Sequence, residues 1–530
     1  MSSPAPGPHA KTLVDGPPKR LSLIHKLVLL LLFSFAHFLQ AFSDAALFPA
    51  IPLLEVSTGI TGTQSAWIIS AFKLTFASFL LISGRISDVY SPKKAFIAGV
   101  SVLGILSIGA GFVSNKIAFI ALRSVMGIAA ALTTPSALTL LVHVFPEPLE
   151  QARAIGVFGG CGAFGNVLGL LIGAVLVQYI SYHWAFWIVA IIAIPVAFTC
   201  IFAIPPEMAK SKNRAHPHIA KWKSLDLIGI FVLTAALILF IYALTSGSAD
   251  GWATAGVLTP LIISIFLIAG FFHWETIVPA HKAAIPPRTW FYNNFAVLFG
   301  SALVPIFWLT SVFIVFTTLW QDVFHWTIIS TSVHLLPIGV ASFIASCTGS
   351  LSRRFSPKWI ILTGYFLTAM SNILCAVGGG RPEDYWTYIF PAFIIGGAGT
   401  SLAYTHTIIA IFQATPASMA GTVGAIISGA LEFGSAVGLA AFTSIQTSVE
   451  ATHGGPQEYY GRAAAFWFFL GIALIEILSL SYFYQRATDH GPQPILDDYD
   501  VVKVSEEMSN ENDEVKNDTL TVKESRSLAV

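Results

Sequence analysis

Blocks of about twenty apolar residues recur along almost the whole chain. An α-helix needs this length to cross the hydrocarbon core of a bilayer, so each block predicts a membrane span. Of the 530 residues, 55% are hydrophobic and only 11% are charged, which excludes a soluble globular enzyme. We therefore expect an all-α integral membrane protein. The predicted spans, about fourteen in number, are 27–51, 63–83, 95–113, 117–142, 156–177, 184–204, 225–246, 257–274, 294–319, 327–348, 359–377, 387–412, 422–446 and 464–484.

Lysine and arginine are distributed very unevenly between the loops on the two sides of the predicted membrane. With a cytoplasmic N-terminus, twenty-three of them fall in inner loops and tails and three in outer loops. This asymmetry follows the positive-inside rule, so we expect a multi-pass protein with both termini in the cytoplasm.

The formal net charge is zero, which argues against a nucleic-acid partner. The four cysteines show no CxxC spacing, so no metal site is expected.

Two segments of the first half of the chain recur in the second half. The stretch 84–93, which ends in Ser-Pro-Lys, recurs as 349–358 at an offset of 265 residues. The glycine-rich stretch 160–169 recurs as 429–438 at an offset of 269 residues. Nearly equal offsets indicate a parallel repeat, in which spans one to six correspond to spans nine to fourteen. Spans seven and eight are then an insertion between the two halves.

This repeat predicts the organisation of the chain, with a solute path where the two halves meet. The end segments are polar, and the last one is also acidic and poor in aromatic residues, as disordered segments are. The expected parts are a disordered cytoplasmic N-terminus (1–24), an N-terminal six-helix half (25–204), a cytoplasmic linker (205–224), two inserted helices (225–275), a C-terminal six-helix half (276–485) and a disordered cytoplasmic tail (486–530).

The loop after the second span combines a glycine, an acidic residue and a basic cluster, in the order Gly84, Arg85, Asp88, Lys93 and Lys94. This loop resembles a cytoplasmic signature of the major facilitator superfamily, and the chain is similar over about residues 25–485 to its fourteen-span drug:H⁺ antiporter branch. The resemblance implies the major facilitator fold and transport by alternating access. In this loop Asp88 can accept hydrogen bonds from a helix N-terminus or from an arginine, and the cluster can then hold one state of two rocking halves. The alternative is a simple positively charged turn.

The fifth span is rich in glycine, including Gly165 and Gly169, and resembles a motif typical of antiporters in this superfamily. Glycines at steps of three and four let neighbouring helices approach and slide, so we count Gly165 and Gly169 with the conformational gate. Asn166 stands where that motif usually has proline, which weakens the inference of export. The segment 81–85, Leu-Ile-Ser-Gly-Arg, and this span also resemble the fungal aminotriazole-resistance group. That group includes low-affinity ammonium transporters.

Three charged residues of the predicted N-terminal half fall inside its spans, namely Asp44, Lys73 and Arg123. A charge at that depth costs several kcal/mol, on the order of 3 kcal/mol or more, unless it is paired or hydrated. Arg123 resembles the family's intramembrane arginine, associated with proton coupling, and Asp44 is its expected partner by depth. A carboxylate that gains and loses a proton beside arginine would couple protons to transport, whereas the alternative is a static ion pair. Lys73 either binds an anionic substrate group or competes with a substrate as a tethered cation.

Four further residues are weaker candidates for the transport path. Glu432, which stands at the repeat position of Ala163, and Glu476 are candidates for a second protonation site, or are protonated and packed. His406 is a proton relay or is hydrogen-bonded to a neighbouring helix. Trp308 lies near the middle of its span and either stacks on an aromatic or cationic substrate or faces lipid.

These features predict a secondary transporter that exports a small molecule or ion in exchange for protons. There is no GxxxxGK[ST] phosphate loop, so the proton gradient is the expected energy source and no cofactor is needed. The alternatives are a low-affinity ammonium or small-solute facilitator and a non-transporting nutrient receptor. An integral-membrane enzyme would need clustered catalytic groups, which the sequence lacks. We expect a monomer whose partners are the substrate, protons and the lipid bilayer, in the plasma membrane or, alternatively, the vacuolar membrane.

Overall fold

The computed structural model describes residues 21–50, 54, 62–206, 226–279 and 282–485. Most of the predicted N-terminal segment and linker, and the whole predicted tail, lie outside the described residues. Within them the chain is helical, and no strand occurs in the described ranges. The fold class expected from the apolar blocks is therefore confirmed.

Each predicted span coincides with a helix or with two consecutive helices. Thirteen helices in the described part are long and apolar enough to cross a membrane, and α3 is also long, with 28 residues, but carries three charged side chains. The bounds in the N-terminal half are α1 (Leu23–Ala45), η1 (Phe48–Ala50), α3 (Gly62–Val89), α4 (Pro92–Ala110), α5 (Lys116–Val144), α6 (Pro148–Tyr179) and α7 (His183–Ala203). The inserted helices are α8 (Leu227–Asp250) and α9 (Ala255–Ile277). The C-terminal half comprises η4 (Pro287–Phe291), α10 (Phe295–Ala302), α11 (Pro305–Thr318), η5 (Leu319–Val323), α12 (Ile328–Ser346), η6 (Cys347–Arg353), α13 (Pro357–Val377), η7 (Tyr385–Ile389), α14 (Phe390–Ala414), η8 (Ala417–Met419), α15 (Ala420–Glu450) and α16 (Tyr460–Phe483).

The ninth predicted span is broken into α10 and α11. Leu303 and Val304 separate the two helices, and α11 begins at Pro305. Proline has no backbone N–H and suits the first turn of a helix, so a helix restarts there rather than continuing through. The break brings irregular backbone into the packed interior of the C-terminal half, where Gly434 of α15 lies against the Leu303 backbone.

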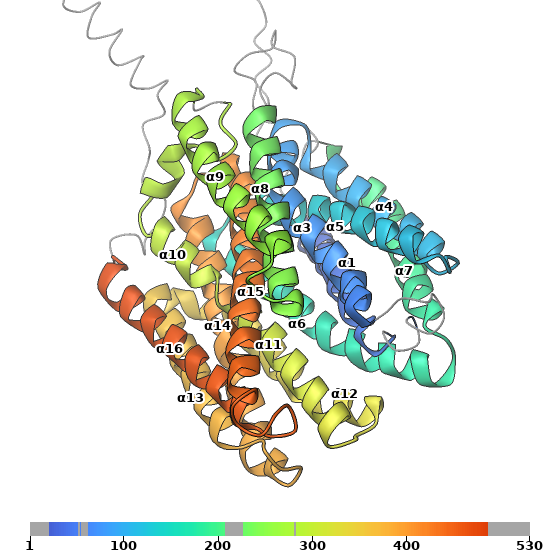
Figure 1. The fold of residues 1–530 in the computed structure, drawn as a ribbon. Helices are drawn as coiled ribbons and strands as arrows, with labels where there is room; N and C mark the ends of the chain where they lie inside the picture. The colour runs from blue at the N-terminus through green and yellow to red at the C-terminus, as the bar shows by residue number, and fades with distance from the viewer. Residues whose placement is uncertain (1–20, 51–53, 55–61, 207–225, 280–281, 486–530) are drawn as a thin grey trace, which may run out of the picture. The chain divides into compact units, whose positions relative to one another are not determined.

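Each half is held together by contacts among its own helices (Figure 1). In the N-terminal half α1 packs on α6, α3 and α4 pack on α5, and α4 packs on α7. In the C-terminal half α12 and α13 pack on α14, α13 packs on α16, and α11 packs on α15. The halves meet along two seams, α3 with α15 and α6 with α12. A cavity between the halves must therefore lie between these two seams.

The inserted helix α8 covers the seam between α3 and α15. Thr234 of α8 donates from Oγ1 to the backbone carbonyl of Ser78 on α3 at 3.2 Å. Phe240 of α8 stacks on Phe433 of α15, with ring centroids 5.0 Å apart. Helix α9 packs mainly on α8, and its other faces are largely exposed. The insertion is thus a side wall shared by both halves.

The repeated Ser-Pro-Lys segment makes the same contact in each half. Lys93, at the start of α4, donates to the backbone carbonyl of Ile204 at the end of α7, at 2.5 Å. Lys358, at the start of α13, donates to the carbonyl of Tyr484 at the end of α16, at 3.0 Å. The last carbonyls of a helix have no partner within that helix, and a lysine also favours the negative end of its dipole. Each segment therefore joins the third helix of its half to the sixth.

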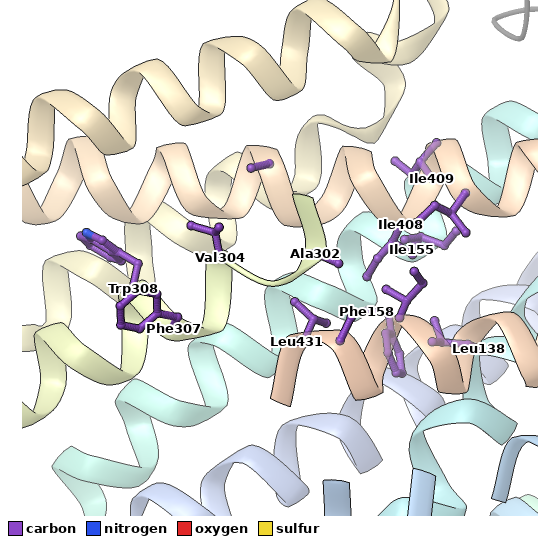
Figure 2. Packing of buried hydrophobic residues seen from close by; sticks show 14 of the residues in the cluster. Leu138, Ile155, Phe158, Ala302, Val304, Phe307, Trp308, Ile408, Ile409 and Leu431 are labelled. Atoms are coloured by element: carbon purple, nitrogen blue, oxygen red, sulfur yellow. The ribbon is translucent and has the colours of Figure 1, made fainter. Parts of the chain in front are cut away.

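Buried aromatic and aliphatic side chains fill the interior of both halves. Figure 2 shows part of this core, in which Phe158 of α6 and Trp308 with Phe307 of α11 belong to one continuous cluster. Trp308 is fully buried, with 0% of its surface exposed. The cluster continues across the seams, so packing and not charge supplies most of the contact between helices.

Candidate functional site

A cavity of about 630 Å³ lies between the two halves. Its walls come from α1, α3, α5 and α6 of the N-terminal half, from α11, α12, α14 and α15 of the C-terminal half, and from Thr245 of α8. Most of the lining is apolar or carries hydroxyl groups. The ionisable side chains among the lining residues are His37, Asp44, Lys73, Tyr404 and Glu432.

Asp44, Lys73 and Arg123 form a connected charged group, which we name the ionic centre. The Lys73 ammonium Nζ lies 3.3 Å from Asp44 Oδ2, and Arg123 Nη2 lies 3.6 Å from Asp44 Oδ1. The three side chains come from α1, α3 and α5. The pairing that their depth in the spans predicts is therefore present, with Asp44 between two cations.

Arg123 lies behind the cavity wall rather than in it. Its side chain is fully buried, and its guanidinium Cζ lies 4.5 Å from the ring centroid of Phe72. A cation over an aromatic face is attracted by the ring, which adds to the attraction of Asp44. The side chains of Asp44 and Lys73 are 13% and 30% exposed, so they are the members of the ionic centre that face the cavity.

Glu432 enters the cavity from α15, on the opposite half. Its repeat counterpart Ala163 also lines the cavity, so the two equivalent positions face the same space. Among the described residues, no hydrogen bond and no ion pair within 4.0 Å engages the Glu432 carboxylate. The arrangement therefore places one carboxylate of the C-terminal half opposite the ionic centre, where it attracts the Lys73 ammonium.

His37 is a cavity residue that the sequence interpretation missed. Its ring stacks on Phe158, with centroids 4.3 Å apart and an interplanar angle of 9°. His37 precedes Asp44 by seven residues, so the two lie on the same face of α1, two turns apart. This spacing is the signal that could have identified it. Gly162 of α6 makes room for the ring, because a Cβ there would overlap His37.

Asp88 joins the two halves at the end of the bundle where α3 meets α4. Asp88 Oδ1 accepts from the backbone N–H of Gly421 at 2.9 Å, and Oδ2 accepts from the N–H and the hydroxyl of Thr422, both at 2.7 Å. These two N–H groups belong to the first turn of α15, where a negative charge is favoured. The carboxylate thus binds the N-terminus of a helix in the other half.

Gly84 allows the close approach that this contact requires. A Cβ at Gly84 would overlap the backbone carbonyl of Gly421, so the two helices touch backbone to backbone. Arg85 donates instead to the carbonyl of Lys282, in the connection after α9, at 3.3 Å. The Lys94 side chain is exposed.

Three members of the predicted gate do not join the halves. Lys93 contacts α7 within its own half, because its ammonium reaches the carbonyls that end that helix. Gly165 and Gly169 pack against α1, also in the same half. In α6, Gly156, Gly159 and Gly160 lie against the other half, and a Cβ at Gly156 would overlap the carbonyl of Ser346. Lys93, Gly165 and Gly169 thus make these contacts within their own half, and their role in the conformational gate stays a prediction.

Three further candidates lie away from the cavity. Trp308 donates from Nε1 to Asn372 Oδ1 at 3.2 Å and is packed in the core, so it does not face a substrate or lipid. His406 is buried and contacts the hydroxyls of Thr348 and Ser352 at 3.3 and 3.2 Å, which holds η6 against α14. Glu476 is partly buried on α16 and does not line the cavity. Periodicity does not show which face of a span looks inward, which is why all three were included.

Comparison with known proteins identifies the family of this chain and several relatives with named functions. Residues 33–439 match the family described as Major Facilitator Superfamily. A multidrug transporter of this superfamily from Aspergillus fumigatus, mfsC, is 27% identical over 88% of this chain and 88% of its own length. The puromycin resistance protein pur8 of Streptomyces alboniger is 26% identical over 76% of this chain and 78% of its own. The low affinity ammonium transporter of Saccharomyces cerevisiae is 24% identical over 82% of this chain and 84% of its own length.

Two solved structures share the fold. The human organic anion transporter MFSD10 superposes with a TM-score of 0.57 at 14% identity, over 88% of this chain and 100% of that one. The proton:xylose symporter XylE superposes with a TM-score of 0.59 at 10% identity, over 88% of this chain and 98% of that one. At these identities the likeness concerns the arrangement of the helices alone.

Proposed function

Because this chain belongs to the Major Facilitator Superfamily and is a secondary transporter, not an enzyme, we propose that it exports a small molecule in exchange for protons. Transport would proceed by alternating access, with the halves rocking about the central cavity. The cavity, the ionic centre and the Asp88 contact are the parts that this mechanism uses. We place the protein in the plasma membrane as a monomer, with both termini in the cytoplasm.

The observation that supports proton coupling most directly is the position of Asp44 between Lys73 and Arg123. Protonation of Asp44 would leave two cations beside the cavity without their shared counter-charge. A charge that loses its partner in a low-dielectric site favours a rearrangement that restores hydration or pairing. The ionic centre can therefore make one conformation more stable when Asp44 is charged and another when it is protonated.

The Asp88 contact supplies the element that must change between conformations. The carboxylate of α3 binds the first turn of α15, and these helices belong to different halves. When the halves separate at this end of the bundle, the three hydrogen bonds must break. Transport would therefore alternate between a state in which Asp88 binds α15 and a state in which it does not.

The test is proton movement in proteoliposomes that carry the purified protein and an internal pH-sensitive dye. Puromycin and ammonium are the first solutes to add, because relatives of this chain are named for them. We expect proton movement only when a transported solute is present, and loss of it in Asp44→Asn. Glu383→Gln, an exposed carboxylate outside the cavity, is the matched control and should behave as wild type.

The alternative function is a low-affinity ammonium facilitator, which the yeast relative favours. A facilitator would move ammonium down its gradient whatever the pH gradient. Solute flux that ignores the imposed pH gradient and persists in Asp44→Asn would reject the antiport mechanism and favour this function.

A further inference from the structure

One side of the central cavity is closed by direct packing of two helices, α6 and α12. At one end of this seam Gly156 of α6 lies against the carbonyl of Ser346. Towards the other end the Ser332 hydroxyl of α12 donates to the carbonyl of Leu170 of α6, at 3.5 Å. Small residues let the two helices approach closely, which leaves no room between them for a lipid chain. This side of the cavity therefore needs no further cover.

On the opposite side, the cavity wall includes a helix that belongs to neither half. Helices α3 and α15 touch backbone to backbone at the end of the bundle that carries Asp88, where Gly84 lies against Gly421. Further along, Thr245 of α8 lines the cavity together with residues of both helices. Because α8 packs on the outside of α3 and α15 (Figure 1), Thr245 can reach the cavity only where those two helices are apart. A lateral window therefore lies between α3 and α15, and α8 fills it.

Without α8, this window would open onto the acyl chains of the bilayer. The outer surface of the inserted pair is apolar, and Phe231 of α8 and Phe266 of α9 are 74% and 73% exposed. Such rings on membrane-spanning helices face lipid. The cavity contains the ionic centre, whose charges are strongly disfavoured in contact with hydrocarbon. The insertion thus stands between lipid and a charged interior.

The two ends of α8 are fixed to different halves. Near its N-terminal end, Thr234 donates to the Ser78 carbonyl of α3 at 3.2 Å. Just after its C-terminal end, Trp252 donates from Nε1 to the Ser444 hydroxyl of α15 at 3.0 Å. Rocking halves separate at one end of the bundle at a time. Each of these two contacts joins α8 to one half only, so α8 can tilt with the motion while both contacts are kept.

We propose that α8 is a permanent lateral seal, which keeps acyl chains out of the cavity in every conformation of the transport cycle. A substrate then enters and leaves the cavity from the aqueous ends and not from the bilayer. The inference goes beyond the proposed function, because it holds for any substrate and with or without proton coupling. It also gives a task to the two helices that have no counterpart in the repeat.

The experiment maps contact with lipid directly. The purified full-length protein is placed in nanodiscs with a phosphatidylcholine that carries a photoactivatable diazirine on its acyl chain. After irradiation, mass spectrometry locates the labelled residues. We expect labelling of the lipid-facing ring of Phe266, and labelling no higher than background at Leu431 and Leu439, two leucines of α15 that line the cavity.

Weakening the attachment of α8 should open the window. The double variant Thr234→Val, Phe240→Ala removes the hydrogen bond to α3 and the ring stack on α15, and should raise labelling of the two cavity leucines about ten- to hundredfold. Phe266→Ala, on the lipid face of α9, is the matched control and should leave these leucines unlabelled. If the double variant does not fold, Trp252→Phe removes only the donor to Ser444 and should raise labelling about two- to tenfold.

A further variant tests whether the seal persists when the halves move. Asp88→Ala removes the carboxylate that joins α3 to α15 but leaves both contacts of α8 in place. The cavity leucines should therefore stay unlabelled in this variant as in wild type.

Three results would overturn the proposal. The first is labelling of the cavity leucines in wild type to the level of Phe266, which would make the window an entrance from the bilayer. The second is their labelling in Asp88→Ala, which would mean that the seal opens with the bundle. The third is unchanged labelling in a monodisperse double variant, since the contacts of α8 would then not hold the window closed.

The outcome is separable from that of the proposed function. If the cavity leucines stay unlabelled and no solute moves protons, antiport is wrong and the seal stands. If protons move and lipid labels the cavity of wild type, antiport stands and the seal is rejected.

Discussion

The two halves of this transporter repeat one design but stabilise their interiors differently. In the N-terminal half, Asp44, Lys73 and Arg123 join α1, α3 and α5 through charges. In the C-terminal half, a neutral contact joins α13 to α10, where the Tyr365 hydroxyl donates to the carbonyl of Ser301. Charges in an apolar interior respond strongly to a proton, whereas neutral hydrogen bonds do not. We therefore predict that the N-terminal half responds to protonation more strongly than the C-terminal half, which contributes Glu432 to the cavity.

Removing a charge from the ionic centre should have the largest effect on both transport and stability. Arg123→Met leaves Asp44 with Lys73 as its remaining partner in the ionic centre and should lower coupled transport at least about a hundredfold, with a loss of about 3–5 kcal/mol in the free energy of unfolding. Thermal unfolding and proteoliposome flux measure the two quantities. The double variant Asp44→Asn, Arg123→Met should recover stability but not coupling. Recovery of coupling in the double variant would show that the charges are only structural.

Breaking the Asp88 contact should have a smaller effect that is confined to the balance between conformations. Asp88→Ala removes a carboxylate that binds the first turn of α15, which is worth about 1–2 kcal/mol to the state that contains it. That corresponds to a shift of about 5- to 30-fold in the ratio of states. Spin labels at the exposed positions Lys94 and Arg354, one in each half, report it as a change in distance distribution.

The repeat offers an internal control for this prediction. Arg353 occupies the repeat position of Asp88, but its side chain is exposed. Arg353→Ala should leave the distance distribution unchanged. An equal shift in the two variants would mean that loss of charge at this end of the bundle, and not the binding of α15, sets the balance.

The Ser-Pro-Lys segments should be equivalent in the two halves. Lys93→Met and Lys358→Met each remove an ammonium from helix-terminal carbonyls, and each should lower the free energy of unfolding by about 1–2 kcal/mol with little change in transport. Thermal unfolding of the two variants side by side is the measurement. A large difference between them would show that the halves differ in more than their charges.

The smallest effect on stability is expected from a neutral hydrogen bond in the core of the C-terminal half. Trp308→Phe removes the donor to Asn372 and should cost about 1 kcal/mol in stability. Substrate affinity should be unchanged, since the indole is buried outside the cavity. A reduced substrate affinity with unchanged stability would show that Trp308 does contact the substrate.

The sequence predicted the fold more completely than the site. The spans and the two halves followed from apolar length and from the repeat, because these are local properties of the chain. Asp44 and Arg123 were paired correctly because a charge inside a span requires a partner at the same depth. The break before Pro305 was missed, although proline in the middle of a span is a signal for it.

Side-chain direction is what the sequence could not supply. His37 faces the cavity and Trp308 faces the core, yet both lie in the middle of apolar spans that show no clear polar side. In a membrane, lipid and protein interior are both apolar, so the pattern that separates inside from outside in soluble helices is weak. The repeat was the exception, since it aligned Glu432 with Ala163 and both line the cavity.

The Ser-Pro-Lys contact also has a consequence for biosynthesis. Lys93 precedes its acceptor Ile204 by 111 residues, and Lys358 precedes Tyr484 by 126. Neither contact can form until the sixth helix of its half has left the ribosome. The N-terminal half can therefore close on itself before α8 has left the ribosome, and a nascent chain stalled before α7 still lacks its closing contact.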